Sequence, residues 1–411
     1  MYLDEQDLVP YAALNYLVAE ANYGGRVTDD KDVRLIRAML RKYFCPEVMN
    51  DSYKLSKLDA YYAPPEGPLA DARAYIETLP QEEDPEVFGL HPNANLAYEV
   101  ATANLLASTV LAMQPRLAGG GAGLTPDQLA QNLSRDIAAK MPALLDKEKA
   151  HPTTFGFSDR GQPLSLGVFV GQEIDRFNAL LAVMKHTLVQ LDKAIQGTVV
   201  MSAALEAMAR AFNDDKVPSQ WEGVGYPSLK PLSSWIPDLL LRVDFLAKWL
   251  YEGPPATFWL PAFFFPQGFM TAAMQTYARK TATAIDTLQF RSHVCAGFAD
   301  SITEGPEDGV NIHGLFLEGC AWSASRGTLE DSAPKVPIAE FPVLWLQPVD
   351  ITENLTQGCF ECPLYKTSIR RGELSTTGHS TNFVCFTHLP TEGDANHWLR
   401  RGAALLCMTD N

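Results

Sequence analysis

The sequence predicts an α+β chain of several domains, with helices first and a small β unit last. Apolar residues recur at helical spacing to about residue 285, and short β-rich runs separated by turn residues follow. The chain has 411 residues, which exceeds the usual size of one domain, so we expect two or three domains. Its 46% hydrophobic and 20% charged content is ordinary for a folded soluble protein.

The first section, about residues 8–115, is predicted to be helical. Pro10 stands where a proline at the first helical position opens a helix, and Thr28 is a good N-cap for a second helix. A long helix is expected over about residues 94–113. The glycine-rich run at 119–123 is the clearest flexible linker in the sequence, and we expect a domain boundary there.

The second section, about residues 124–285, is also predicted to be helical. Its apolar residues form a seam with alternating steps of three and four: Ile174, Phe177, Leu181, Met184, Leu188, Leu191 and Ile195. A free coiled coil is one interpretation. A long helix packed inside a bundle is the favoured one, because the seam stops near Gly197. Residues 258–269 are too apolar to face water, so we expect them at the junction of the helices and the β unit, or against a neighbouring module.

From about residue 286 the spacing becomes strand-like. Strands are predicted over residues 310–317, 343–346, 363–369 and 383–389. Five or six such runs in about 125 residues predict a small antiparallel barrel or sandwich. The best turn signals are Asp308-Gly309 and Arg371-Gly372.

Charge and cysteine content exclude several classes of function. The net charge of −16 argues against nucleic-acid binding, which needs a basic surface. Seven scattered cysteines form an odd set, which is typical of a reducing compartment. The acidic N-terminus is unlike a signal peptide, and no uninterrupted apolar run reaches the roughly 20 residues that span a bilayer. We therefore expect a cytoplasmic protein without a membrane segment.

The motifs of common enzymes are missing from the sequence. There is no G-x-x-x-x-G-K-[ST] string and no G-x-G-x-x-G string, and the glycine run at 119–123 lacks the lysine and hydroxyl of a phosphate-binding loop. The string GHSTN at 378–382 is close to a nucleophile elbow, but Asn382 stands where glycine is required. A polar turn is the favoured interpretation. We predict no catalytic and no cofactor-binding residue.

One set of residues has the spacing of a structural zinc site: Cys359, Cys362, Cys385 and His388. Cys359 and Cys362 form one pair, Cys385 and His388 form another, and 22 residues separate the two pairs. Such a set would suit the tetrahedral coordination of zinc. However, Cys385 and His388 differ by three along a predicted strand, so they should point to opposite faces. Free cysteines are the favoured interpretation, and we predict no metal site.

Several strings resemble motifs of dynein heavy chains. They occur in the order of that family and cover nearly the whole sequence: NYGGRVTDD (22–30), VFGLHPNA (87–94), QEIDRFN (172–178), YPSLKPL (226–232), FFFPQGF (263–269), CPLYKTS (362–368) and LSTTGHSTNFV (374–384). The last two strings resemble the axonemal rather than the cytoplasmic branch. Lys31 departs from the family pattern, which has tryptophan there, and this puts the local packing in doubt.

The resemblance implies an architecture and a role. Residues 1–118 would be the lid of the sixth AAA module, 119–285 the helical part of the C-terminal domain, and 286–411 its small β-barrel. The chain would be a non-catalytic, ring-capping and regulatory segment of an axonemal heavy chain, which drives minus-end-directed movement along microtubules. The modules that hydrolyse ATP and the microtubule-binding tip would lie outside it.

The resemblance also implies partners and a location. The partners would be the remaining AAA ring and the intermediate and light chains, with microtubules contacted only indirectly, in the cytoplasm and the axoneme of cilia or flagella. The alternative is a stand-alone dynein-like protein that binds other dynein or ciliary components, since Met1 opens the sequence close to the first motif.

Overall fold

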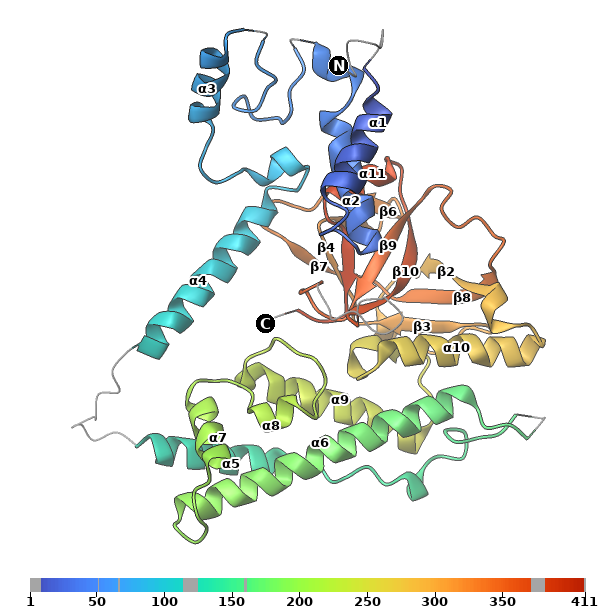
Figure 1. Cartoon of the computed structure of the whole chain (residues 1–411). Coiled ribbons are helices and arrows are strands. Elements are labelled where there is room, and N and C mark those ends of the chain that lie inside the picture. Colours follow the sequence, from blue (N-terminus) through green and yellow to red (C-terminus); the bar gives the residue numbers. More distant parts are fainter. Residues whose placement is uncertain are drawn as a thin grey trace.

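The chain has an N-terminal helical section (residues 9–113), a helical middle section (125–285) and a β-rich section (286–409) (Figure 1). The computed structural model describes residues 9–50, 52–65, 67–113, 125–158, 161–370 and 381–409. The predicted linker at 119–123, the predicted turn at Arg371-Gly372 and residues 378–380 of the serine motif lie outside the described residues.

The N-terminal section is helical, as predicted. Its elements are α1 (Tyr11–Tyr16), η2 (Leu17–Asn22), α2 (Asp30–Tyr43), η3 (Pro46–Met49), α3 (Leu69–Thr78), η4 (Pro85–Phe88) and α4 (Asn93–Met113). The predicted long helix is confirmed as α4, but both predicted helix starts are wrong by one residue. Pro10 precedes α1. Asp29, not Thr28, caps α2, because its carboxylate accepts a hydrogen bond from the Lys31 backbone N–H at 2.9 Å.

The middle section is a helical bundle around α6. Its elements are α5 (Pro126–Lys140), η5 (Lys147–Lys149), α6 (Ser165–Ile195), α7 (Ala203–Asn213), α8 (Ser219–Glu222), α9 (Leu232–Glu252), β1 (Phe258–Trp259), η6 (Leu260–Ala262) and α10 (Pro266–Thr281). Helices α5, α7, α8, α9 and α10 all contact α6. Every residue of the predicted seam except Ile195 is buried, so the bundle interpretation is confirmed.

The β-rich section consists mostly of short strands. Its elements are η7 (Ile285–Thr287), β2 (Leu288–Val294), η8 (Ala299–Ser301), β3 (Val310–His313), β4 (Phe316–Glu318), β5 (Ala321–Ser323), β6 (Thr328–Glu330), β7 (Ile338–Glu340), β8 (Leu344–Asp350), β9 (Cys359–Tyr365), β10 (Phe383–Pro390), α11 (Ala395–Arg400) and β11 (Ala404–Leu406). One sheet has the order β1-β3-β8-β2, a second has the order β10-β9-β11-β4-β7, and β5 pairs with β6.

The prediction of a small antiparallel barrel is wrong. Strand β1 pairs with β3 in parallel and β11 pairs with β9 in parallel, so both larger sheets are mixed, and the described strands form no closed barrel. The predicted strand at 310–317 is two strands in different sheets. The chain divides at Gly314, whose φ is +80°, and a Cβ there would lie 2.4 Å from the Trp259 ring. Glycine is therefore required at the division.

The apolar segment at 258–269 lies at the junction of the bundle and the sheets, as predicted. Phe258, Phe263 and Phe269 are almost completely buried, and one continuous core joins them to residues of α6 and to strands β8 and β9. The rings of Phe263 and Phe269 are stacked with centroids 5.0 Å apart. The β-rich section is therefore packed against the helices, not separate from them.

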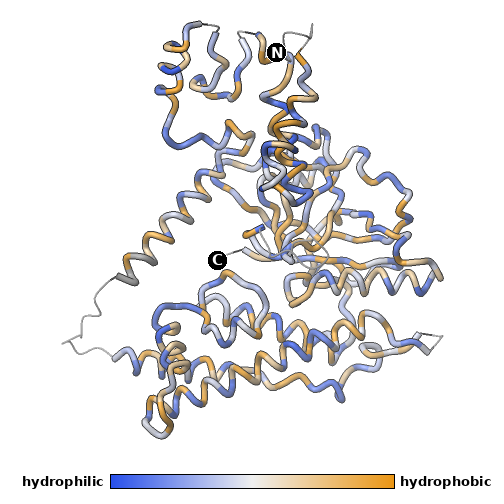
Figure 2. Tube along the Cα trace, viewed as in Figure 1, coloured by the Kyte–Doolittle hydropathy of each residue, from blue (hydrophilic) through white to orange (hydrophobic). Residues whose placement is uncertain are grey.

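Figure 2 shows hydrophobic residues along most of α4, which extends away from the sheets. Several of its apolar side chains are exposed: Tyr98 by 64%, Leu106 by 64% and Val100 by 51%. No helix of the described residues is long and apolar enough to cross a membrane.

Two charged side chains are fully buried beside the 258–269 segment. The Arg242 guanidinium donates to Asp238 Oδ2 (2.6 Å) and to the Pro261 carbonyl, and it lies 4.0 Å from the centroid of the Tyr226 ring. Glu173 Oε2 accepts from the Phe264 backbone N–H at 2.6 Å, and Glu173 also pairs with Arg176. Burial raises the pKa of Glu173, although these hydrogen bonds and charges oppose the rise.

Replacing Arg242 should therefore destabilise the chain strongly. In Arg242→Met the carboxylate of Asp238, whose side chain is only 14% exposed, loses its counter-ion, and we expect the free energy of unfolding to fall by about 3–5 kcal/mol. Lys248→Met is the matched control, since Lys248 pairs with Asp244 four residues earlier on the same helix but at the surface. It should change little. Similar urea-unfolding curves for both variants would contradict this account.

Candidate functional site: a polar interface between helices and sheets

Helix α2 lies against the β9–β10 pair through two basic side chains. Arg34 Nη1 donates to Glu361 Oε2 at 2.6 Å, and Nη2 donates to the Glu361 carbonyl at 3.3 Å. The Lys31 Nζ lies 4.0 Å from the centroid of the Phe383 ring and 3.6 Å from Asp29 Oδ1. A cation over an aromatic face is attracted to the ring quadrupole. Position 31, where the resemblance leads us to expect tryptophan, is thus occupied by a lysine that covers the Phe383 ring.

Asn93, the first residue of α4, joins this section to the loop before β7. Its Nδ2 donates to the carbonyls of Ala333 (2.9 Å) and Val336 (3.0 Å), and its Oδ1 accepts from the Lys335 backbone N–H (2.8 Å). Asn93 is only 8% exposed. The amide therefore pairs three backbone groups of a loop that is about 240 residues away in sequence.

Arg401, just after α11, forms a third connection. Its Nη1 donates to the Leu90 carbonyl at 2.9 Å, and its Nε contacts Asp331 Oδ1 at 3.2 Å. Asp331 also lies 3.0 Å from His397 Nε2. Burial would raise the pKa of Asp331, but His397 and Arg401 outweigh it and the pKa is lowered.

Gly89, in the string VFGLHPNA, permits the close approach of α11. Its φ is +87°, and a Cβ there would lie 2.8 Å from the Cβ of Arg400. Only glycine takes this conformation without strain and leaves room for Arg400. Together with the Leu90 carbonyl and Asn93, it makes this string the contact surface for the β-rich section.

The string FFFPQGF connects the bundle to the other side of the β9–β10 pair. Gln267 Nε2 donates to the carbonyls of Thr381 (3.1 Å) and Phe383 (2.8 Å). Phe383 therefore receives Lys31 of α2 on its ring and Gln267 of α10 on its backbone. Strand β10 is fixed to both helical sections.

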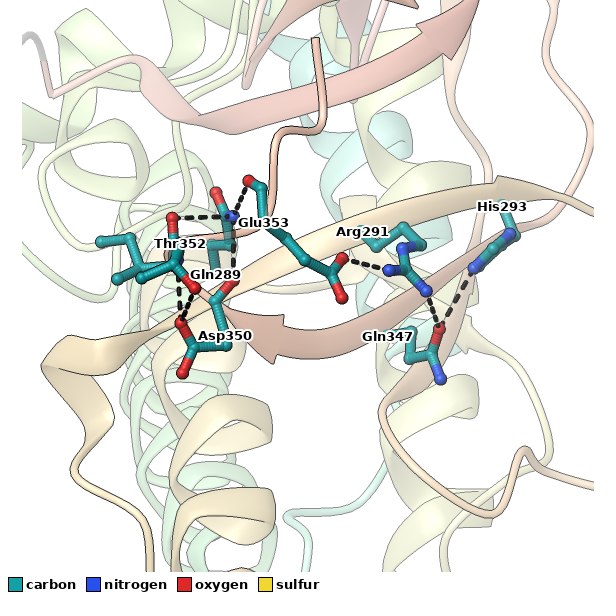
Figure 3. Close-up of polar contacts among 8 residues, drawn as sticks. Gln289, Arg291, His293, Gln347, Asp350, Thr352 and Glu353 are labelled. Atoms are coloured by element: carbon teal, nitrogen blue, oxygen red, sulfur yellow. Dashed lines mark hydrogen bonds and ion pairs between the residues drawn. The ribbon is translucent and has the colours of Figure 1, made fainter. Parts of the chain in front are cut away.

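A separate polar cluster links β2 and β8 to the turn after β8 (Figure 3). Gln347 Oε1 accepts from Arg291 Nη1 at 3.4 Å and lies 3.2 Å from His293 Nε2, while Arg291 also pairs with Glu353. The His293 ring stacks on Trp345, with centroids 4.8 Å apart. Because β2 and β8 pair directly, these contacts fix the register of the two strands.

The residues considered for zinc do not come together. Cys362 is paired with Thr387 and Cys359 with Pro390 in the β9–β10 register, and Cys362 is completely buried in the core. Burial raises the pKa of Cys362 and of Cys385 to about 12 each. Within the described residues, no three His, Cys, Asp or Glu side chains are grouped so as to hold a metal ion.

Arg34, Asp331 and Arg401 were not predictable as interface residues. Arg34 and Glu361 are 327 residues apart, and no local pattern indicates such a pair. Asn93 and Gln267 lie inside the motif strings, but their partners do not follow from those strings. The interface is thus a set of positioning contacts between distant segments.

The fold and this interface define a class of protein: a helical N-terminal section fixed by polar side chains to a unit of helices and mixed sheets. Comparisons with known proteins agree. The family of the dynein heavy chain AAA lid domain matches residues 1–94, and the family of the C-terminal domain of the dynein heavy chain matches residues 100–407. The protein belongs to the dynein heavy chain family.

Similar proteins are axonemal heavy chains. Dynein axonemal heavy chain 3 of Mus musculus is 41% identical over 414 residues, which are all of this chain and 10% of that protein. Dynein axonemal heavy chain 12 of Homo sapiens is 41% identical over 415 residues, all of this chain and 13% of that protein. Dynein axonemal heavy chain 6 of Homo sapiens is 39% identical over 419 residues, 97% of this chain and 10% of that protein. The chain therefore spans about a tenth of the length of these relatives.

Removing the Asn93 amide should loosen the interface. In Asn93→Ala three backbone groups of the 333–336 loop lose their partner, and we expect the free energy of unfolding to fall by about 2–3 kcal/mol. The Lys335 amide should exchange its hydrogen faster. Asn95→Ala is the matched control, because Asn95 is exposed on the same helical turn. Unchanged exchange at Lys335 in Asn93→Ala would contradict the role given to the amide.

The contribution of Asp331 should depend on pH. Its folded-state pKa lies below the ordinary value of 3.8, so its stabilisation is present above that pH and is lost as the pH falls through the folded-state pKa. Asp331→Asn should therefore lower the urea midpoint at pH 7, and its difference from the parent should shrink as the pH is lowered below 3.8. Glu392→Gln, at an exposed position close to α11, is the control. A difference that does not vary with pH would argue against the ionic contact.

Proposed function

We propose that this chain is the non-catalytic, ring-capping and regulatory segment of an axonemal dynein heavy chain. In that role it contributes to ATP-driven, minus-end-directed movement along microtubules in cilia or flagella. The single observation that carries the proposal is the pair of family matches, which extend from residue 1 to 94 and from 100 to 407 in the order of the heavy chain. The ATP-hydrolysing modules would lie in the part of the heavy chain that these residues do not include.

The proposal divides the chain into three parts. Residues 1–118 are the lid of the sixth AAA module, 119–285 are the helical part of the C-terminal domain, and 286–411 are its β-rich part. The interface around Asn93, Arg34 and Arg401 then joins the lid to the β-rich part. A lid that is fixed in this way would move together with the capping domain.

The remaining AAA ring is the proposed main partner. The exposed apolar side chains of α4, among them Tyr98, Val100 and Leu106, support it, because a long apolar surface on a soluble protein marks an interaction site. Intermediate and light chains would join in the assembled complex, and microtubules would be contacted only indirectly. The location would be the cytoplasm and the axoneme.

A truncated heavy chain tests this role. Removing the residues that correspond to 119–411 should leave ATP hydrolysis intact but change how it is coupled to velocity or force, since a cap shifts the ring only through contacts that differ between its states. Full-length motors with Asn93→Ala should show a smaller change than the truncation, and those with Asn95→Ala none. A folded, truncated motor with unaltered velocity, run length and force would overturn the regulatory role. Mg²⁺-dependent ATP turnover by the 411-residue chain alone would overturn the non-catalytic one.

A further inference from the structure

A pocket of about 480 Å³ opens where the N-terminal section meets the end of α11. The end of α2, residues 54–57, Glu86, Gly89 and the end of α11 form its walls. It shares Gly89, His397, Arg400 and Arg401 with the interface described above, whereas Lys42, Lys54, Ser56, Lys57 and Glu86 belong to the pocket alone. The volume lies in the range of about 300–1,000 Å³ that small-molecule pockets occupy.

The lining of this pocket is strongly basic. Five cationic side chains and one histidine line it, together with a single carboxylate, that of Glu86. The basic residues are Lys42, Lys54, Lys57, His397, Arg400 and Arg401. The protein as a whole has a net charge of −16, so this concentration of positive charge runs against its overall composition.

Part of this charge has no counter-ion. Lys54 pairs with Asp59, and Arg401 and His397 share Asp331. Within the residues that the structure describes, Lys42, Lys57 and Arg400 form no ion pair. Three of the lining cations are therefore not neutralised by an ion pair among the described residues.

The electrostatics of Lys42 reflect the crowding. Burial lowers its pKa, and the nearby Arg400 lowers it further, while Glu86 opposes the change only in part. Neighbouring cations repel one another and so destabilise the folded protein unless an anion binds between them. Binding of a negatively charged ligand at this site would therefore be electrostatically favourable.

Helix ends account for only part of the basic set. Lys42 is in the last turn of α2 and Arg400 in the last turn of α11, where a cation balances about half a negative charge at each helix end. Lys54 and Lys57 come from a segment outside any helix, and Arg401 follows α11. The excess of positive charge remains after both helix ends are balanced.

We propose that this pocket binds a compact multivalent phosphate anion, of the size of a di- or triphosphate group. Arginine and lysine side chains are the usual donors to phosphate oxygens, and both kinds line this pocket. An extended polyanion is disfavoured, because the net charge of −16 repels it outside the pocket. The lining contains no tryptophan, tyrosine or phenylalanine side chain to stack on a nucleotide base, so the phosphates are the recognised group. This site is additional to the proposed ring-capping role and does not depend on it.

Titration calorimetry of the 411-residue chain with sodium tripolyphosphate tests the proposal. We expect saturable binding with one ion per protein molecule, weakened about tenfold in Lys42→Gln and in Arg400→Gln. Glu86→Gln removes the opposing carboxylate and should tighten binding, a gain that a misfolded variant could not give. Lys248→Gln is the matched control, because Lys248 is a surface cation that does not line the pocket and pairs with Asp244.

Tightening in Glu86→Gln, together with loss in Lys42→Gln and Arg400→Gln, would establish the site. No saturable binding at low ionic strength would overturn the proposal, as would equal affinities in Arg400→Gln, Glu86→Gln and the Lys248→Gln control. Tighter binding of a hexaglutamate peptide than of tripolyphosphate would overturn the assignment to a compact phosphate anion.

Discussion

The rest of the structure depends on the burial of residues 258–269 between the helical bundle and the two sheets. This segment leaves α9, pairs with β3 through β1 and then enters α10, so it belongs to both parts at once. Phe263 and Phe269 are in contact with Phe169 of α6, while Phe258 is in register with Ile312 of β3. Because one apolar core includes the helices and the strands, neither part can bury its own surface alone.

Apolar contacts alone would not fix how the parts are oriented, because burial has no preferred direction. The hydrogen bonds of buried and half-buried polar groups fix this orientation, because they are directional. Glu173 of α6 holds the Phe264 backbone, Gln267 of α10 holds β10, and Asn93 of α4 holds the 333–336 loop. A rotation of one part against another would leave these groups unpaired in a low-dielectric interior, at a cost of about 1–3 kcal/mol each. Asn93 and Gln267, which join different sections, both lie in strings that resemble dynein heavy chain motifs.

Local order was predictable from the sequence, and long-range pairing was not. The seam from Ile174 to Leu191 and the turn at Gly309, whose φ is +83°, follow from spacing and residue type alone. The N-cap at Asp29 was missed because Thr28 and Asp29 are both good caps and only the geometry decides between them. The parallel pairing of β11 with β9, and the Arg34–Glu361 contact, join segments that no periodicity connects. The sequence therefore identified the motif strings that contain some of the interface residues, but it did not predict which segments these residues contact.

The rigidity of the interface limits where regulation could arise. Effects on a ring require contacts that differ between its conformations. Strand β10 is held by Lys31 of α2 and by Gln267 of α10, so the N-terminal section and the bundle are tied to the same strand. In the proposed role, contacts that differ between ring states would be made by surfaces that the described residues leave uncovered. The exposed apolar side chains of α4 are such a surface, and so are the lining cations Lys42, Lys57 and Arg400, which form no ion pair among the described residues. The string VFGLHPNA contributes to both surfaces, since Gly89 lines the pocket and Asn93 begins α4.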